Sequence, residues 1–446
     1  MAASRFPHPL TLLVACIALA AALTWVLPAG RFDRRDDAAT GRSVVVAGTW
    51  HRVESQPVGP FAAVVAIPRG IIDAASVIGL VFLIGGAFTV VERTGTLGRL
   101  VEWIAARLAG RGLLVIPVAT GVFAVGGALM QTQEELIAFV PILLLLCRRL
   151  GFDALTAVAM SLGAAAVGAA FSPVNPFQVA IAQKLAELPP ASGLGYRLAF
   201  LAPALALWAW GTMRHARRTR VAPQAVEGPA AGALAARDAG IIGLVIATFA
   251  LYVYGVGRFG WEFEHLAALF FAMGVVAGIA GGLRVSGTAD GFVEGFRSMA
   301  LAALLIGFAR AIFVVLDDGA VIDTIVHGVF TPIAGLPVAL SAVGMMAVHA
   351  GIHFPVPSTS SQAILTMPVL VPLSDLLGLS RQVTVLAYQY GAGICELVTP
   401  TNGALMAMLA AAEVPFDRWF GFAARLCLAL FGLGAVAIVV GILVGL

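Results

Sequence analysis

The segments Ser172-Pro173-Val174-Asn175-Pro176 and Thr399-Pro400-Thr401-Asn402-Gly403 each interrupt an otherwise apolar run. The second segment follows the first by 227 positions, and the same spacing aligns Pro141 with Pro368 and Gly151 with Gly378. An unwound turn within a membrane helix frees backbone polar groups that lipid cannot satisfy, so these groups face a cavity, an ion or a substrate. The repeat therefore indicates a transporter built from a duplicated unit.

Composition supports this interpretation, because the 446 residues are 60% hydrophobic and only 11% charged. Several apolar runs approach the roughly 20 residues that a helix needs to cross a bilayer, and they leave no room for a separate globular domain. The net charge of +3 is small and Lys184 is the single lysine, so nothing indicates a nucleic-acid surface. The cysteines show no metal-ligand spacing and are expected to act as small hydrophobic residues: Cys16, Cys147, Cys395 and Cys427. The sequence therefore predicts an all-α polytopic membrane protein.

Arginine positions orient the first half, residues 1–220, by the positive-inside rule. Arg5 precedes the first apolar run, 10–27, which places the N-terminus in the cytoplasm and the loop 28–58 outside. A helix at about 74–91 returns to the cytoplasm. The region at about 113–150 has arginines at both ends and a polar interruption at 130–135, which predicts a re-entrant hairpin. A broken helix at about 154–183 then leads outward, and a helix at 196–213 returns to an arginine cluster, Arg214, Arg217, Arg218 and Arg220.

The second half, residues 238–446, follows a cytoplasmic linker at 221–237 that is rich in alanine, proline and glycine. Three helices are predicted next, near 240–256, 266–283 and 299–316, and this odd number inverts the second half. Its hairpin is expected at about 336–377, its broken helix at about 382–411, and a last helix from Trp419 leaves the C-terminus outside. Two inverted repeats, each with a re-entrant helical hairpin and a broken transmembrane helix, suit an alternating-access carrier.

Four polar elements are expected to converge at mid-membrane: the two hairpin tips and the two helix breaks. Amide and hydroxyl side chains with freed carbonyls can coordinate a monovalent cation, while the N-termini of half-helices favour a carboxylate. The expected substrate-binding residues are Gln133, Glu134, Glu135, Asn175, Pro176, Ser358, Thr359, Ser360, Ser361, Thr399, Thr401 and Asn402. The expected coupling-ion residues are Glu134, Glu135, Ser172, Asn175, Glu396 and Asn402.

Each of these features also has a purely structural interpretation. The two asparagines can cap half-helices, and the hydroxyl run at the second tip can serve helix packing. The glutamates can pair with arginine; Arg310, within an apolar helix, either pairs with one of them or extends its charge to the membrane surface. His349 and His353 are spaced i, i+4, but the sequence lacks the glutamate of an H-E-x-x-H helix and a third ligand, so we expect no metal site.

At these residues the chain resembles the YfcC branch of the anaerobic four-carbon dicarboxylate carrier (DcuC-like) family, within the ion-transporter superfamily. The resemblance covers nearly the whole length and rests on the segments 27–34 (LPAGRFDR), 134–139 (EELIAF), 175–177 (NPF), 362–368 (QAILTMP), 381–383 (RQV) and 399–402 (TPTN). It implies an inner-membrane secondary transporter, a homodimer, with a scaffold domain and a moving domain that holds the hairpins. Dicarboxylate carriers of the superfamily use Ser-Asn-Thr motifs at tips and breaks, whereas this chain has Gln-Thr-Gln-Glu-Glu and Ser-Thr-Ser-Ser at its tips. Relatives of the branch are also labelled as amino-acid carriers or basic amino-acid antiporters.

The leading hypothesis is a secondary active transporter, an ion-coupled symporter or exchanger of a small carboxylate-bearing metabolite, either an amino acid or a dicarboxylate. Transport is expected to proceed by an elevator-like movement of both hairpins and both broken helices, coupled to sodium or protons. We expect no enzymatic activity and no resident cofactor. The expected location is a bacterial-type inner membrane, with the N-terminus cytoplasmic and the C-terminus external. The alternatives are an intramembrane hydrolase and a non-transporting receptor on a carrier fold.

Overall fold

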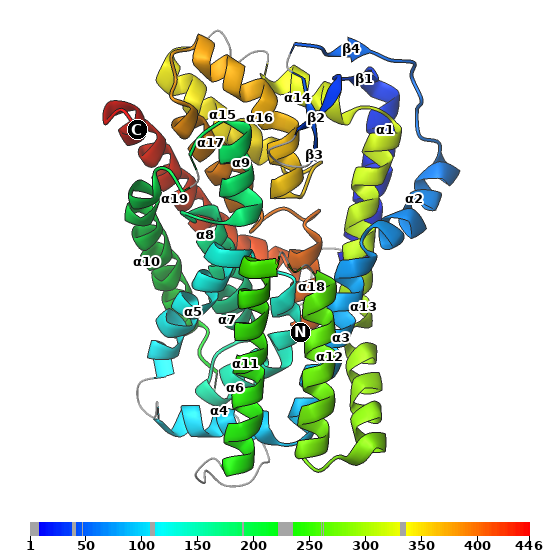
Figure 1. Cartoon of the computed structure of the whole chain (residues 1–446), viewed down its shortest axis with the longest axis vertical. Helices are drawn as coiled ribbons and strands as arrows, with labels where there is room; N and C mark the ends of the chain where they lie inside the picture. Colours follow the sequence, from blue (N-terminus) through cyan, green and yellow to red (C-terminus); the bar gives the residue numbers. More distant parts are fainter. Residues whose placement is uncertain are drawn as a thin grey trace.

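The computed structural model describes residues 9–37, 42–46, 48–107, 112–189, 191–221, 235–259, 261, 263–330 and 336–446. Most helices run along the long axis of the molecule (Figure 1). Within the described residues, four helices are long and apolar enough to cross a membrane: Ala75–Arg93, Gly112–Leu129, Arg284–Asp318 and Phe416–Leu443. The predicted helical membrane fold is therefore confirmed in this general form. Most of the predicted linker, together with Arg5, lies outside the described residues.

Short strands interrupt the otherwise helical chain in the loop that follows α1 (Pro9–Val26), where the sequence predicted no regular element. They form two antiparallel ribbons: β1 (Gly30–Arg31) with β4 (His51–Arg52), and β2 (Arg34–Asp37) with β3 (Arg42–Val45). Asp323 of α14 (Ile322–Phe330) anchors this segment, because it accepts the Phe32 N–H at 2.9 Å and the Arg34 guanidinium at 3.0 Å. These small ribbons are the non-helical elements that the sequence did not predict, and they leave the helical fold class unchanged.

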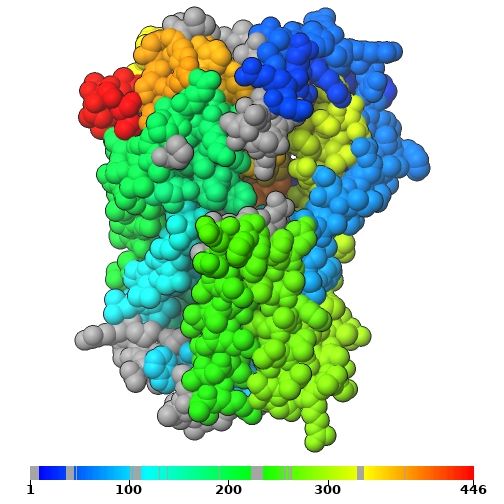
Figure 2. Space-filling model, viewed as in Figure 1, coloured from blue at the N-terminus to red at the C-terminus, as the bar shows by residue number. Residues whose placement is uncertain are grey.

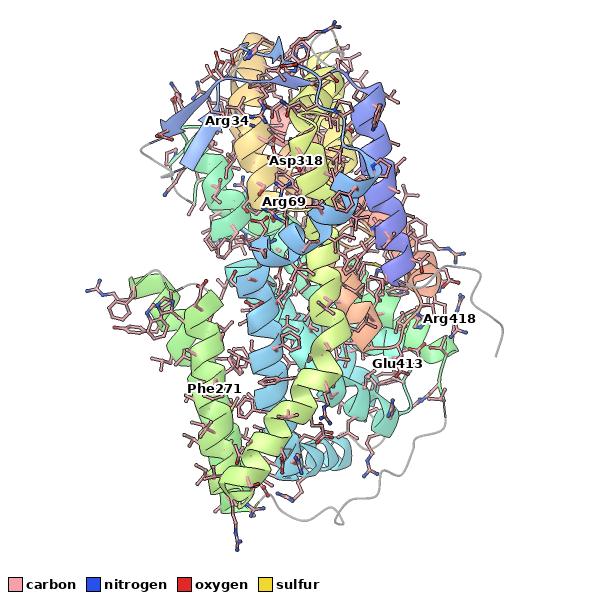
Figure 3. All side chains as sticks on the ribbon, turned by 90° about the vertical axis from the view of Figure 1, so that its right-hand side faces the viewer. Arg34, Arg69, Phe271, Asp318, Glu413 and Arg418 are labelled. Carbon is pink, nitrogen blue, oxygen red and sulfur yellow. The ribbon has the colours of Figure 1, made fainter. Side chains whose placement is uncertain are left out.

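One group of helices packs around α13 (Arg284–Asp318), which contacts α1, α2 (Pro60–Asp73), α3 (Ala75–Arg93) and α12 (Phe263–Ala280). At 35 residues α13 is much longer than the predicted 299–316, because its polar first half is also helical. Gly295 allows a close crossing with α3, since a Cβ there would lie 2.5 Å from the Gly86 Cα. Arg69 pairs with Asp318 at the other end of α13 (Figure 3). The helices α4 (Thr96–Arg107) and α11 (Ala236–Phe259) flank this group.

The first hairpin consists of α5 (Val115–Met130), a tip at 131–134, the 3₁₀ turn η2 (Glu135–Phe139) and α6 (Val140–Leu150). Gln131 ends α5 in the left-handed conformation, with φ of 55°. The broken helix follows as α7 (Ala154–Val158), the π-helical turn η3 (Ala159–Gly163) and α8 (Ala164–Ala170), and it resumes after the break as the π-helical turn η4 (Pro176–Ala180) and α9 (Ile181–Leu185). Pro173 and Pro176 lack the N–H that a continuous helix would need.

The second half contains the same order of elements: α15 (Val338–Ile352), a tip at 353–358, α16 (Thr359–Leu376), α17 (Arg381–Cys395), a break at 396–402 and α18 (Gly403–Ala411). In both halves the first hairpin helix crosses the broken helix closely. A Cβ on Gly168 would lie 2.2 Å from the Ala124 carbonyl oxygen, and one on Gly391 would lie 2.3 Å from that of Met346. The hairpins approach the middle of the molecule from opposite ends (Figure 1). Their re-entrant nature and inverted relation stay predictions.

The helices α10 (Leu194–Arg218) and α19 (Phe416–Leu443) pack against each other and against the broken helices. Each contributes a fully buried tryptophan. The Trp208 indole donates to the Ala159 carbonyl at 2.8 Å, and the Trp419 indole donates to the Leu397 carbonyl at 2.7 Å. Both indoles thus satisfy backbone groups where the broken helices depart from regular α geometry.

Candidate functional site

The tip of the first hairpin contacts the break of the second half. The Gln131 side-chain amide donates to one carboxylate oxygen of Glu396 at 3.1 Å, and the Gln133 amide donates to the other. Glu396 and Gln133 are both buried. A buried carboxylate is costly unless it is protonated or hydrogen-bonded. The two glutamines therefore help to hold Glu396 in the protein interior.

The second hairpin tip joins this network through Thr359, the first residue of α16. The Gln131 amide lies 3.1 Å from the Thr359 hydroxyl, and the Tyr388 hydroxyl of α17 donates to the Thr359 carbonyl at 2.7 Å. Both tips and the second break, three of the four polar elements predicted to converge, thus meet in the structure.

A cavity of about 230 Å³ lies beside this network. Its polar lining comes from both tips, the second break, α2 and α13: Asp73, Glu134, Arg310, Ser358, Thr401 and Asn402. Figure 2 shows a depression near the middle of the molecule, with an orange-brown segment of the second half visible inside it. The cavity thus combines charged and hydrogen-bonding groups within a mainly apolar helical protein.

Arg310 pairs with Asp73, at the end of α2, and its guanidinium lies 4.6 Å from the centre of the Phe313 ring. This finding corrects the expectation that Arg310 pairs with one of the three glutamates, whereas its extension to the membrane surface stays a prediction. Sequence reasoning did not assign Arg310 or Asp73 to the site. The available signal was an ionisable residue inside an apolar helix, which marks a functional position by default.

The polar groups of the first break are used within the protein and do not line this cavity. The Ser172 hydroxyl donates to the Ala128 carbonyl at 2.6 Å and accepts the Asn175 N–H at 2.8 Å. The Asn175 amide donates to the Gly127 carbonyl at 2.9 Å, and its oxygen accepts the N–H groups that follow Pro176. None of Ser172, Asn175 and Pro176 lines the cavity. Asn175 does border the first tip, because its amide and the Gln131 backbone N–H donate to the same Gly127 carbonyl.

Gln389 of α17 connects the first break to the second half. Its amide donates to the Ser172 carbonyl at 2.7 Å, its side-chain oxygen accepts from the buried Arg197 guanidinium at 2.9 Å, and its carbonyl accepts from Gln178 at 3.1 Å. Sequence reasoning missed Gln178, Arg197 and Gln389. Their signal was the presence of amide and guanidinium groups in apolar helices, but their partners depend on the tertiary fold.

The other predicted residues lie near the network with local partners. Glu135 is buried, and one of its carboxylate oxygens has no hydrogen-bond partner among the described residues. The Thr399 hydroxyl donates to the Cys395 carbonyl, and the Thr401 hydroxyl donates to the Phe354 carbonyl at 2.7 Å. Asn402 accepts the Leu405 N–H at 3.1 Å as the cap of α18. Ser360 and Ser361 lie in the first turn of α16 within 3.4 Å of the Ser358 hydroxyl.

A smaller cavity of about 160 Å³ lies toward β3 and is lined by Arg34, Asp317 and Ser361. Phe313 and Val356 line both cavities, so these two side chains lie between them.

His349 and His353 are buried in the second hairpin, where Gln362 contacts both rings. The distances to their Nδ1 atoms are 3.0 Å and 3.2 Å. Among the described residues, no three or more His, Cys, Asp or Glu side chains are grouped so that they could hold a metal ion.

Comparison with known proteins shows the family. The family model described as "C4-dicarboxylate anaerobic carrier" (DcuC) matches residues 6–443. The "Putative basic amino acid antiporter YfcC" of Escherichia coli (strain K12) is 32% identical and covers 98% of this chain and 97% of its own length. An uncharacterized protein of Haemophilus influenzae is 27% identical, and it also covers 98% of this chain and 97% of its own length.

Two solved structures align at low similarity. The Alcanivorax borkumensis YdaH transporter has a TM-score of 0.45 and 19% identity, and covers 98% of this chain and 99% of its own. Neisseria gonorrhoeae MtrF has a TM-score of 0.40 and 16% identity, and covers 97% of this chain and 95% of its own. The match to the family model and the relative from E. coli show that this chain is a YfcC-like member of the C4-dicarboxylate anaerobic carrier (DcuC) family, a multi-pass membrane transporter.

Proposed function

We propose that the chain is a secondary active transporter, an ion-coupled symporter or exchanger, that binds a small carboxylate-bearing metabolite in the 230 Å³ cavity. The observation that carries the proposal is the presence of Arg310, Asp73 and Glu134 around one cavity next to both hairpin tips. A cavity below the roughly 300–1,000 Å³ of drug-sized sites suits a solute of few heavy atoms.

The charges favour an amino acid. Arg310 can donate to a carboxylate through its planar guanidinium, whereas Glu134 or Asp73 can accept from an ammonium group. With all three groups ionised, the lining carries one negative charge in excess. A solute with an amino group and a carboxylate therefore matches the cavity, and the name of the E. coli relative, "Putative basic amino acid antiporter YfcC", points to the same class.

A dicarboxylate is the second candidate, and the description of the family favours it. Such a solute would meet one guanidinium and two carboxylates, so it would need a compensating cation. Glu134 and Glu396 are the proposed acceptors of that cation, either sodium or a proton, because Glu134 lines the cavity and Glu396 binds the tip next to it. Sodium or proton coupling is proposed for the amino acid as well.

An elevator-like movement is the proposed mechanism. The hydrogen bonds of the tips join the hairpins to the second break, whereas Arg310 pairs with Asp73 within the group of helices around α13. The cavity lies at the boundary of these two groups. We propose that the hairpins and broken helices move as the transport domain against this scaffold, in a homodimer.

Transport by purified protein in proteoliposomes tests the proposal. We expect uptake or exchange of a labelled basic amino acid or of labelled succinate that depends on a sodium or pH gradient and is lost in Arg310→Gln. Glu264→Gln, at an exposed position on α12, serves as the control and is expected to transport as the parent does. Binding without transport would instead indicate a receptor, and an absence of both would overturn the assignment of the cavity.

The proposed orientation places the loop at Arg214 to Arg220 in the cytoplasm and Leu446 outside. Cysteines introduced singly at these sites, in a variant without the four native cysteines, are expected to react with membrane-impermeant reagents from opposite sides. Cytoplasmic labelling at both sites would contradict the inverted repeat.

A further inference from the structure

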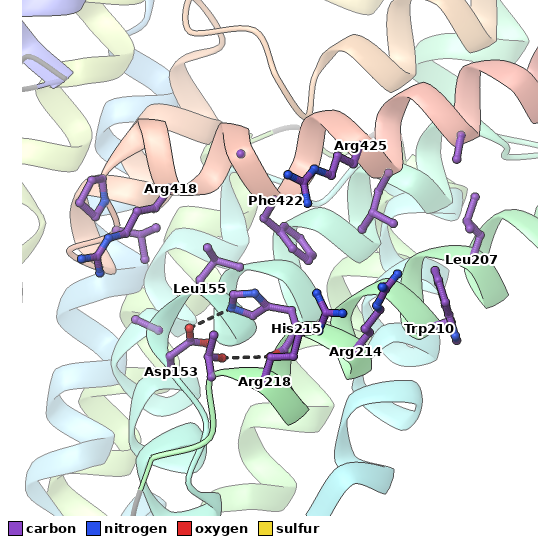
Figure 4. Close-up of a pocket in the computed structure, with 18 of the residues that line it drawn as sticks. Asp153, Leu155, Leu207, Trp210, Arg214, His215, Arg218, Arg418, Phe422 and Arg425 are labelled. Carbon is purple, nitrogen blue, oxygen red and sulfur yellow. Dashed lines mark hydrogen bonds and ion pairs between the residues drawn. The ribbon is translucent and has the colours of Figure 1, made fainter. Parts of the chain in front are cut away.

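A second and larger cavity, of about 670 Å³, lies between the cytoplasmic end predicted for α10 and the first half of α19 (Figure 4). None of the predicted site residues lines it. Its polar lining includes the hydrogen-bonded pair Asp153 and His215, whose Oδ2 and Nε2 atoms lie 2.9 Å apart.

Four arginines surround this cavity, two from each helix. Arg214 and Arg218 are four residues apart on α10, and Arg418 and Arg425 are seven apart on α19, so each pair lies on one helix face. No ion pair joins any of the four guanidiniums to a carboxylate within the described residues. In Figure 4, Arg425 and Arg214 lie on opposite sides of the gap between the helices.

The acidic residues of the lining do not balance this charge. Asp153 and Glu413 are the two carboxylates, so two positive charges remain in excess with His215 neutral. Burial alone would raise the pKa of the Asp153 carboxyl, but hydrogen bonds from His215 and Thr156 outweigh it and hold that pKa below its usual range. Asp153 is therefore engaged by His215 and Thr156 and makes no ion pair with the arginines.

One wall of the cavity is apolar and continues onto an exposed helix surface. It is formed by Leu207, Trp210, Phe422, Leu426 and Ala429. Trp210 is 52% exposed, and the Arg214 guanidinium lies 5.4 Å from the centre of its ring. Leu428, beside this wall, is 75% exposed. An exposed tryptophan beside arginines is typical of the membrane interface, and here the cavity joins a basic end to an exposed apolar surface.

We propose that this cavity binds the phosphate headgroup of an anionic phospholipid, with its acyl chains along the apolar wall of α10 and α19. Guanidiniums form charge-assisted, often bidentate hydrogen bonds to phosphate oxygens, and basic pockets between membrane helices bind anionic headgroups. Facing guanidiniums repel each other, and a bound phosphate offsets that repulsion. The apolar wall favours a lipid over a free phosphate ion.

Titration of lipid into purified, delipidated protein in a neutral detergent tests this site. Tm is measured at each lipid concentration, and the concentration that gives half of the full rise in Tm is the readout. The probes are phosphatidylglycerol, phosphatidylcholine with the same chains, and inorganic phosphate. Arg214→Gln/Arg425→Gln and, independently, Arg218→Gln/Arg418→Gln are expected to weaken the response to phosphatidylglycerol by about five-fold per arginine. Phosphatidylcholine and phosphate are expected to give little response.

The matched control is Arg217→Gln/Arg297→Gln, which removes the same charge from exposed positions outside the cavity. It is expected to respond as the parent does. If the control lost as much of its response to phosphatidylglycerol as the cavity variants do, the lipid would be held by non-specific electrostatic attraction. An equal response to phosphatidylcholine, or a response to inorganic phosphate without one to phosphatidylglycerol, would likewise overturn the proposal.

Discussion

The two helix breaks share a sequence pattern but differ in what their polar side chains contact. In the first break, Ser172 and Asn175 are fully buried and bond to the backbone of α5 and of their own turn. In the second break, Glu396 binds the tip of the first hairpin, and Thr401 and Asn402 line the cavity. The first break thus fixes its hairpin in place, whereas the second supplies groups to a cavity.

The difference follows from residues that diverged within the repeat. At the spacing of 227 positions, Glu396 corresponds to Ala169 and Thr401 to Val174, so the first break lacks a carboxylate and a hydroxyl that the second has. Asparagine is present at both breaks, and each caps the half-helix that follows. A repeated motif therefore predicts common architecture more safely than common chemistry.

The largest expected effect is on Glu396, the residue that most separates the two breaks. Glu396→Gln removes the ionisable carboxyl group and brings an amide N–H next to the Gln131 or Gln133 amide, so a hydrogen bond is lost in a buried network. We expect transport to fall by about a hundred-fold or more, which corresponds to roughly 3 kcal/mol. The rate of transport into proteoliposomes is the measurement, and Glu264→Gln is the control. Parental transport by Glu396→Gln would end the functional distinction between the breaks.

The asparagines test the comparison directly. Asn402→Ala removes the cap of α18 and also a group from the cavity lining, so we expect a lower Tm and substrate binding that weakens by about 1–3 kcal/mol, or roughly ten- to a hundred-fold. Asn175→Ala removes a helix cap and the bond to the Gly127 carbonyl, so we expect a lower Tm and binding close to that of the parent. Binding and Tm of both purified variants are the measurements. An equal loss of substrate affinity in the two variants would restore the alternative that both asparagines form one site.

The positions of the tips and breaks could be predicted because their signals are local. Proline lacks the N–H that a continuous helix needs, and a polar side chain is costly next to lipid. Residues such as Pro173 and Gln131 therefore mark where membrane helices end. The length of α13 was underestimated for a related reason: apolarity defined 299–316, whereas the polar turns that precede it are equally compatible with a helix.

The partners of the charged and amide residues could not be predicted in the same way. Arg310 pairs with Asp73, which is 237 positions away, and Gln389 bonds to Ser172 across 217 positions. Nothing in the local sequence of Arg310 distinguishes Asp73 from the three glutamates as a partner. The contact of the first tip with the second break likewise arises from the packing of the two halves, which a sequence repeat does not specify.

A smaller effect is expected at the first tip, where neighbouring glutamates differ as the two breaks do. Glu134 lines the cavity, whereas Glu135 is buried away from it. We expect Glu134→Gln to change the pH or sodium dependence of transport and to lower its rate by about ten-fold, since it removes about 1.4 kcal/mol of cation or substrate binding. Glu135→Gln is expected to keep the ion dependence of the parent. Transport rates of both variants, measured with and without pH and sodium gradients, test this difference. If both variants keep the parent's dependence on pH and sodium, both glutamates serve packing only.

The smallest expected effect concerns the hydroxyl that the second break has and the first lacks. The Thr401 hydroxyl donates to the Phe354 carbonyl at 2.7 Å, which ties the break to the second tip, whereas Val174 has no equivalent donor. Thr401→Val keeps the shape and removes this bond, so we expect a loss of about 0.5–1.5 kcal/mol in the free energy of unfolding.

Val174→Thr is the reciprocal change, and it adds a hydroxyl at a half-buried position where the Ser172 hydroxyl already accepts the Val174 N–H at 3.0 Å. We expect it to alter the free energy of unfolding by less than about 0.5 kcal/mol. Unfolding in mixed micelles with increasing denaturing detergent measures both variants. An equal loss in the free energy of unfolding for the two variants would mean that the Thr401 hydroxyl does not hold the second break against its hairpin. The contrast between the breaks would then rest on Glu396 and Asn402 alone.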